Sequence, residues 1–99
     1  MRIVIEIPKK RKYDPIIIAD AVYLRDYKIK IFFKDKTVKV VDFKEFLFNE
    51  YVHPIYKRYR KLSVFKKFDV IDGNLNWYDY EMIFPVEQLY AGKIFVYTH

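Results

Sequence analysis

Three stretches in the first half of the chain carry the pattern of half-buried β-strands, in which apolar and polar residues alternate. The first, residues 16–24, opens on a β-branched run, and the second, residues 27–33, alternates along its length. The third, residues 37–43, follows a lysine-rich break. Because the breaks are short and polar, the pattern predicts a three-stranded antiparallel meander with one solvated face.

The phase of the alternation assigns each side chain to a face of the sheet. In the second strand, the residues predicted to be buried are Ile29, Ile31 and Phe33. In the third strand, we assign Val38 and Val40 to the buried face and Lys39 to the outer face.

The apolar period changes to that of a helix after residue 42. Apolar residues recur at the spacing i, i+3, i+4, at Phe43, Phe46 and Leu47. Asp42 is a suitable N-cap for this helix. A second helical segment begins at Pro54, and the spacing i, i+4, i+7 predicts one apolar stripe made of Ile55, Tyr59 and Leu62.

The pair Asp72-Gly73 is the strongest turn signal in the sequence, because a two-residue hairpin turn requires positive φ and both residues tolerate it. It predicts a β-hairpin followed by a further short strand. Pro85 suits the first position of a helix, and Gly92 suits its end. We therefore predict a short closing helix from Pro85 to Ala91.

Residues 1–15 differ from the rest of the chain in their pattern. Residues 3–7 alternate as a strand, and a charged linker follows them. We predict that residues 1–15 lie outside the core and that residues 16–99 form a single domain; the pattern leaves open whether the first strand joins the main sheet. The order of strands, helices, strands and helix is typical of a two-layer α+β fold.

Composition narrows the class of protein. The chain has 99 residues, of which 53% are hydrophobic, and this fits one packed domain. Cysteine is absent, which excludes disulfides and thiolate metal sites. The longest apolar run is too short to span a bilayer. We therefore expect a cytoplasmic protein that makes no use of a membrane.

Charge is unevenly distributed around the formal net value of +6. Residues 1–67 contain eighteen lysines and arginines against eight acids, whereas residues 68–99 contain one against five. This asymmetry indicates either a polyanionic partner or attraction between two faces, within the fold or across a dimer.

The end of the chain resembles a small bacterial family, the domain of unknown function 2442. The residues that carry the resemblance are a hairpin tryptophan and a proline–acid–leucine–tyrosine series: Trp77, Pro85, Glu87, Leu89 and Tyr90. The acid stands two positions after the proline, whereas many members have it directly after. The upstream segments VVDF and HPIYKRYRKLSVFKKFDV, the latter with Leu62 and Phe65, also resemble that family. The resemblance covers roughly residues 16–92.

What the resemblance implies is mainly structural, since the family has no established activity. Members occur as stand-alone small proteins, sometimes beside another small uncharacterised protein. The resemblance therefore implies a protein partner, in a pairing similar to that of a toxin and an antitoxin.

Residue types that support catalysis are sparse. His53 precedes a proline in a loop, His99 is the other histidine, and Ser63 is the single serine. Nucleophile–histidine systems and zinc sites are therefore almost unsupported. Asp79 and Glu81 share one face of a strand, and we interpret that face as solvated. We expect no catalytic, metal or cofactor site.

Two basic surfaces are candidates for binding a polyanion. One is the outer sheet face, with Lys28, Lys30, Lys34 and Lys39. The other is the second helical segment, with Lys57, Arg58, Arg60 and Lys61. Lysine on an exposed strand also discourages aggregation, and an amphipathic helix ordinarily has a polar outside, so both surfaces also have a structural explanation.

Trp77, Tyr78 and Tyr80 form a candidate patch for a protein partner, because these side chains bury large areas and keep a polar group. The alternative is that Trp77 anchors the core beneath the last helix. We predict a non-enzymatic interaction domain that contacts another small protein or a second copy of itself. The alternative function is a nucleic-acid-binding accessory domain that uses the basic helix.

Overall fold

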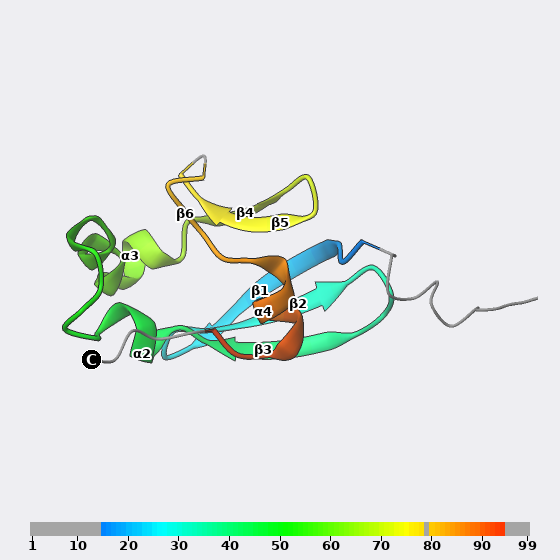
Figure 1. Cartoon of the computed structure of the whole chain (residues 1–99), viewed down its shortest axis with the longest axis horizontal. Helices are drawn as coiled ribbons and strands as arrows, with labels where there is room; N and C mark the ends of the chain where they lie inside the picture. The colour runs from blue at the N-terminus through cyan, green and yellow to red at the C-terminus, as the bar shows by residue number, and fades with distance from the viewer. Residues whose placement is uncertain (1–14, 79, 95–99) are drawn as a thin grey trace, which may run out of the picture.

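The computed structural model describes residues 15–78 and 80–94 (Figure 1). Along these residues the elements are β1 (Ile18–Arg25), β2 (Lys28–Phe33), β3 (Val38–Asp42), α2 (Lys44–Leu47), η1 (Pro54–Arg60), α3 (Leu62–Phe65), β4 (Phe68–Ile71), β5 (Asn74–Trp77), β6 (Met82–Ile83) and α4 (Val86–Ala91). None of these helices has the length and apolar character that crossing a membrane requires. The strand predicted at residues 3–7 lies outside the described residues.

Strands β1, β2 and β3 form an antiparallel meander within residues 18–42, as the alternation predicted. Ile29, Ile31 and Phe33 of β2 are buried, so their assignment to the inner face is confirmed. Figure 1 shows the second sheet and α4 lying along one side of this meander. The fold is α+β with two small antiparallel sheets and short helices, which confirms the predicted class.

The assignment of faces in β3 is wrong. Lys39 lies on the inner side of the sheet, whereas Val38 and Val40 are exposed on the outer side. Val41 and Phe43 are fully buried instead. Because valines adjoin at positions 40 and 41, the strand by itself fits either phase. Burial of Val41 and Phe43 removes more apolar surface from water than burial of Val38 and Val40, because phenylalanine is larger than valine. This larger gain decides the phase.

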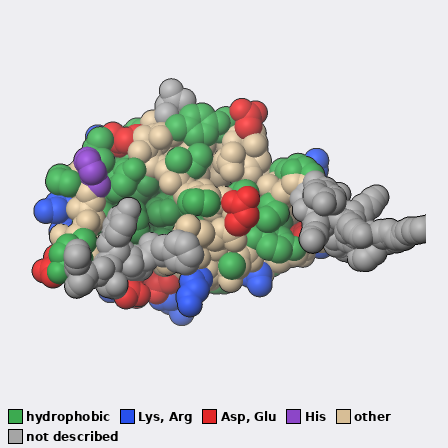
Figure 2. Space-filling model, viewed as in Figure 1, with side chains coloured by type: hydrophobic (Ala, Val, Ile, Leu, Met, Phe, Trp, Pro, Cys, Tyr) green, Lys and Arg blue, Asp and Glu red, His purple; other side chains and the backbone are tan. Residues whose placement is uncertain are grey.

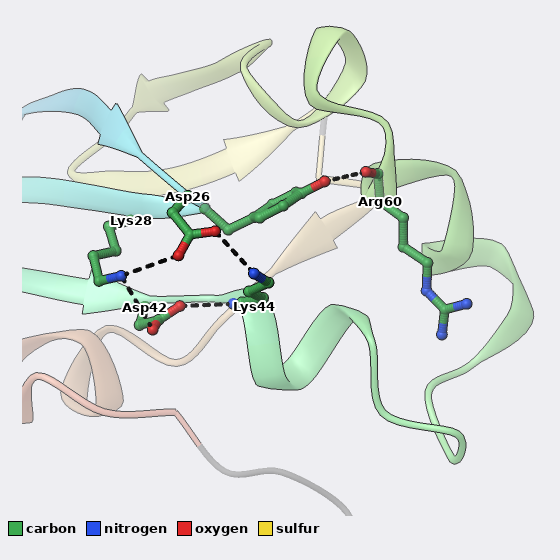
Figure 3. Close-up of polar contacts among 6 residues, drawn as sticks. Asp26, Lys28, Asp42, Lys44 and Arg60 are labelled. Carbon is green, nitrogen blue, oxygen red and sulfur yellow. Dashed lines mark hydrogen bonds and ion pairs between the residues drawn. The ribbon is translucent and has the colours of Figure 1, made fainter.

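A chain of ion pairs ties the β1–β2 turn to the start of α2 (Figure 3). The Lys28 ammonium lies 3.6 Å from a carboxylate oxygen of Asp26 and 3.7 Å from one of Asp42. Lys44 donates a hydrogen bond of 2.9 Å to Asp26, which holds the pKa of that carboxyl below its usual value. Asp42 accepts the backbone N–H of Lys44, so it satisfies the first donor of α2 although Phe43 occupies the N-cap position.

The second helical segment is a 3₁₀-helix, so its predicted apolar stripe is confirmed at Tyr59 and wrong at Ile55 and Leu62. Tyr59 is fully buried and Tyr56 is half-buried, at the three-residue spacing that brings side chains into line in a 3₁₀-helix. Ile55 and Leu62, which the α-helical period assigned to the core, are exposed. The extended backbone of Lys61 ends η1 and separates it from α3.

Strands β4, β5 and β6 form the second antiparallel sheet of the described chain. The turn between β4 and β5 has φ of +51° at Asp72 and +78° at Gly73, as the hairpin prediction requires. Pro85 is the N-cap of α4, and Gly92 ends the helix in the left-handed conformation. The predicted hairpin and closing helix are therefore both confirmed.

The two sheets meet in an aromatic core around Trp77. This side chain is fully buried, and its ring centroid lies 5.7 Å from Phe43, 5.5 Å from Phe65 and 6.0 Å from Phe84. Its indole N–H donates a hydrogen bond of 2.6 Å to the carbonyl of Phe65. Trp77 therefore anchors the core, and its ring contacts with Phe43, Phe65 and Phe84 come from segments that precede the last helix.

Replacing Gly73 should destabilise the fold more than replacing Gly92. A Cβ at Gly73 would lie 2.9 Å from Cγ2 of Ile17, whereas a Cβ at Gly92 would make an ordinary contact of 3.7 Å with Cδ of Lys39. The two positions have nearly equal φ, +78° and +83°. We expect Gly92→Ala to lower the free energy of unfolding by about 1 kcal/mol and Gly73→Ala by about 2–3 kcal/mol.

Urea denaturation followed by circular dichroism measures both losses. Gly92→Ala is the control for the cost of placing a Cβ on a backbone with positive φ. Equal losses in the two variants would show that the close approach of Ile17 to the turn contributes nothing.

Candidate functional site

A groove of about 730 Å³ lies between the loop that precedes η1 and the segment that joins β6 to α4. The residues described along it are mostly apolar or aromatic: Phe46, Tyr51, Val52, His53, Pro54, Tyr56, Ile83, Phe84, Pro85 and Gln88. Neither a lysine nor an acid is among these described lining residues. Figure 2 shows apolar side chains gathered on this face of the molecule, with lysines and arginines mainly at its margins.

Two prolines begin the walls of the groove. Pro54 opens η1, where Nδ1 of His53 accepts the N–H of Ile55 at 3.2 Å. Pro85 precedes α4, and its carbonyl accepts the N–H of Gln88 at 3.0 Å. Because proline has a fixed φ and no N–H to leave unpaired, it suits the start of a helix and presets the backbone of both walls.

The base of the groove is continuous with the core. The Phe46 ring lies 5.0 Å from Phe84 and 5.9 Å from Tyr56, measured between ring centroids. Phe84 is buried and contacts Trp77, so the base is held by the same rings that join the sheets. Tyr51 and Ile83 are exposed at the rim. The groove thus combines a packed aromatic base with an apolar rim that faces solvent.

Beside the groove, four side chains form what we call the Arg58 cluster: Arg58, Tyr59, Tyr78 and Glu81. Nη2 of Arg58 lies 2.6 Å from Oε1 of Glu81, and the guanidinium carbon lies 4.6 Å from the Tyr78 ring centroid. The Tyr59 hydroxyl donates to the same carboxylate oxygen of Glu81. Burial of Tyr59 and this hydrogen bond raise the pKa of Tyr59 to about 12.

Two tyrosines at the adjoining turn have strained backbone. Tyr78 has a φ of +45° and Tyr80 a φ of +71°, in the left-handed region that non-glycine residues rarely enter. Both side chains are exposed. The buried side chain of Asn76 accepts the N–H of Tyr80 at 3.4 Å and so supports the turn from below. Asp26, Tyr27, Lys36 and Asp72 also have positive φ at turns, so it is the exposure of the two tyrosines that makes this turn a candidate contact surface.

The predicted partner patch is divided by the sheet. Tyr78 and Tyr80 are exposed as the patch requires, whereas Trp77 is buried and is not part of it. The reason is the alternation of β5, in which Leu75 and Trp77 share the inner side.

The basic residues of the second helical segment have unequal roles. Arg58 belongs to the Arg58 cluster, and Nε of Arg60 donates to the carbonyl of Leu47 at 2.6 Å. Both arginines thus hold neighbouring segments together. Lys57 and Lys61 are exposed. The structure therefore separates the four predicted residues into two that make contacts within the fold and two that face solvent.

The lysines predicted on the outer sheet face are also divided. Lys28 lies between the carboxylates of Asp26 and Asp42 (Figure 3), and Nζ of Lys30 lies 5.5 Å from the Phe32 ring centroid. Lys39 is on the inner side, as described above. Lys34 is exposed beyond the end of β2. These four side chains do not form one basic surface.

The groove itself was not predicted from the sequence. Its walls come from segments about thirty residues apart, and short-range spacing carries no information on such pairs. The one local signal is a pair of prolines, each followed by a helix and preceded by aromatic or apolar residues.

The acids and histidines of the described residues are dispersed over the fold. Within residues 15–78 and 80–94, no group of three or more histidines, cysteines or acids is placed to hold a metal ion. Glu81 is not a simple solvated carboxylate, because it binds Arg58 and Tyr59. Asp79, its predicted neighbour on one face, lies outside the described residues.

Comparison with known protein families matches residues 18–95 to the family described as "Protein of unknown function (DUF2442)". The chain belongs to this family. The predicted resemblance, over residues 16–92, is therefore confirmed. In this DUF2442 protein the matched region contains both sheets, the groove and the Arg58 cluster, and residues 1–17 precede it. The searches of curated proteins and of solved structures found no match.

Stability should fall at high pH through Tyr59. Its pKa in the folded state, about 12, lies above the ordinary tyrosine value near 10, so folding favours the neutral phenol. The stability that this provides is complete below about pH 10 and is lost as the pH rises through about 12. Between about pH 10 and 12, we expect the free energy of unfolding of Tyr59→Phe to fall by about 2 kcal/mol less than that of the wild type. Urea denaturation at each pH measures the difference.

Tyr80→Phe is the matched control, because it removes an exposed phenol from the neighbouring turn. The control should follow the wild type. If the free energy of unfolding depended on pH in the same way in Tyr59→Phe and the wild type, the role given to Tyr59 would be contradicted.

Proposed function

We propose that this DUF2442 protein is a non-enzymatic interaction domain that holds an apolar segment of another small protein in the groove. The observation that carries the proposal is the aromatic base and exposed apolar rim of that groove. Its volume falls within the range of about 300–1,000 Å³ that is typical of ligand sites. An apolar rim costs free energy when it faces water, and a partner that covers it removes this cost.

The chemistry of the lining supports an apolar segment as the ligand. Since the described lining contains neither a lysine nor an acid, a charged ligand gains no direct ion pair within the groove. The polar groups of His53 and Tyr56 along the walls suit hydrogen bonds that orient a peptide.

The Arg58 cluster and the strained turn extend the proposed surface beyond the groove. η1 supplies both Tyr56 of the groove and Arg58 of the cluster, and Ile83 of the groove follows closely after Tyr80. Arginine and tyrosine are enriched among the residues that contribute most to protein–protein binding. We therefore assign Tyr78 and Tyr80 to the rim of the partner surface.

A nucleic-acid-binding role is the alternative, supported by the net charge of +6 and by the exposure of Lys57 and Lys61. It has less support because Arg58 and Arg60 are already bound to groups of the fold. Removing those arginines would test stability rather than binding.

Peptides selected from a random phage-displayed library should bind the wild type through the groove. We expect the selected sequences to be apolar and aromatic, and Ile83→Asp to weaken their binding at least about tenfold, because a carboxylate at the rim must lose its hydration. Isothermal titration calorimetry with the synthesised peptide measures the change.

Leu62→Asp is the matched control for that titration. Ile83 and Leu62 are 41% and 39% exposed, and Leu62 does not line the groove. Equal binding by wild type and Ile83→Asp, or equal weakening by both variants, would remove the groove from the proposed function.

Binding to labelled random DNA and RNA should be weak and limited to low salt. Any cationic domain releases counterions from a polyanion, so we expect fluorescence anisotropy to show affinity that disappears near about 150 mM salt. Lys57→Ala with Lys61→Ala should then behave as Lys34→Ala with Lys93→Ala, which removes the same charge elsewhere. Micromolar binding at that salt, lost selectively in the Lys57 and Lys61 variant, would place the nucleic-acid role first.

A further inference from the structure

The edge strands of the two sheets differ in how their backbone groups are covered. At β1, a carbonyl of the β4–β5 turn accepts the N–H of Ile18 at 2.9 Å, and the Asp20 carboxylate accepts the N–H of Ala21 at 2.8 Å. At β4, the Asp69 carboxylate accepts the N–H of Val70 at 3.1 Å. Carboxylates placed on an edge in this way discourage another strand from pairing with it.

Strand β3 is an edge of a different kind. The N–H of Phe33 donates to the carbonyl of Thr37 at 2.8 Å, and pairing in an antiparallel hairpin alternates from there. The backbone N–H and C=O groups of Val38, Val40 and Asp42 therefore point away from β2. Among the described residues, β2 is the one strand that pairs with β3.

The side chains of β3 favour pairing with a further strand. Val38 and Val40 are 44% and 48% exposed and lie on the outer face, and both are β-branched. The charged residue between them, Lys39, lies on the opposite side, near the end of α4. The outer face of β3 thus has no charge between Val38 and Val40 that would oppose a neighbouring strand.

We propose that β3 pairs with β3 of a second copy of this chain and joins the two first sheets into one. A two-fold axis at Val40 gives an antiparallel register that is self-complementary. Val40 then lies opposite its own counterpart, and Val38 lies opposite Asp42 at both ends. In this register, every outward N–H and C=O of these three residues has a partner on the other copy.

Charge complementarity supports a second copy as the occupant of this edge. Asp42 of each copy, which also lies 3.7 Å from Lys28, would lie beside the end of β3 that adjoins the β2–β3 turn. There Lys34, Asp35 and Lys36 of the other copy are exposed and carry a net charge of +1. Opposite charges would therefore face each other at both ends of the paired strands. Between them, the valines of the two copies would form one apolar strip. Since five residues of strand bury little area, we expect a weak, concentration-dependent dimer.

Sedimentation equilibrium of the full chain, from about 5 μM to about 1 mM, tests the proposal. The wild type should be a dimer at the upper end of this range. Val40→Lys should weaken dimerisation at least about tenfold, because like charges would meet at the two-fold axis. Val22→Lys is the control, since Val22 is 45% exposed on the same sheet face but on the covered β1 edge. It should shift the dissociation constant by less than about twofold.

Hydrogen exchange provides a second readout that does not depend on substitution. The amides of Val38 and Val40 should exchange more slowly as protein concentration rises. A wild type that stays monomeric throughout would overturn the proposal. Equal loss of dimer in Val40→Lys and Val22→Lys would also overturn it, because a face-to-face contact would then be responsible.

The dimer is independent of the proposed groove function, because β3 contributes none of the described lining residues. Val40→Lys should bind the groove peptide as the wild type does. A failure to dimerise and a failure to bind the groove peptide are therefore distinguishable results.

Discussion

The contact between Phe43 and Trp77 is the constraint on which the rest of the structure depends. Each sheet has an apolar face that must be covered from water. Phe43 comes directly after β3 and Trp77 ends β5, so their ring contact closes the two sheets onto each other. The hydrogen bond from the Trp77 indole to the carbonyl of Phe65 fixes the orientation of that ring. Phe84 connects this arrangement to the groove, because it contacts Trp77 and lines the groove.

Much of the fold could be predicted from the sequence, because its turns and alternations are local signals. The Asp72-Gly73 hairpin and the helix between Pro85 and Gly92 rest on backbone preferences of single residues. The phase of β3 could not be predicted, since adjacent valines make both phases possible until Phe43 finds its place in the core. The 3₁₀ geometry of η1 was also missed, because a segment rich in aromatic and basic residues fits a period of three or of 3.6.

The candidate site was less accessible to prediction than the fold. A local run of cations makes Arg58 a candidate for binding a polyanion, but its role follows from Glu81, twenty-three positions later. The same bond explains why Glu81 is not a solvated carboxylate and why Arg58 is poorly placed to bind a polyanion. Tyr78 and Tyr80 are exposed, as a partner patch requires. Their strained backbone is a property of the turn that residue type alone does not indicate.

Trp77 is the single tryptophan of the chain, and its position makes it an internal optical probe. A fully buried indole emits at shorter wavelength than one in water, so unfolding should appear as a red shift without any label. The ring also contacts Phe84, which lines the groove. One fluorophore therefore lies between the junction of the sheets and the base of the groove, and its emission reports on the integrity of the fold and on changes at the groove in the same spectrum.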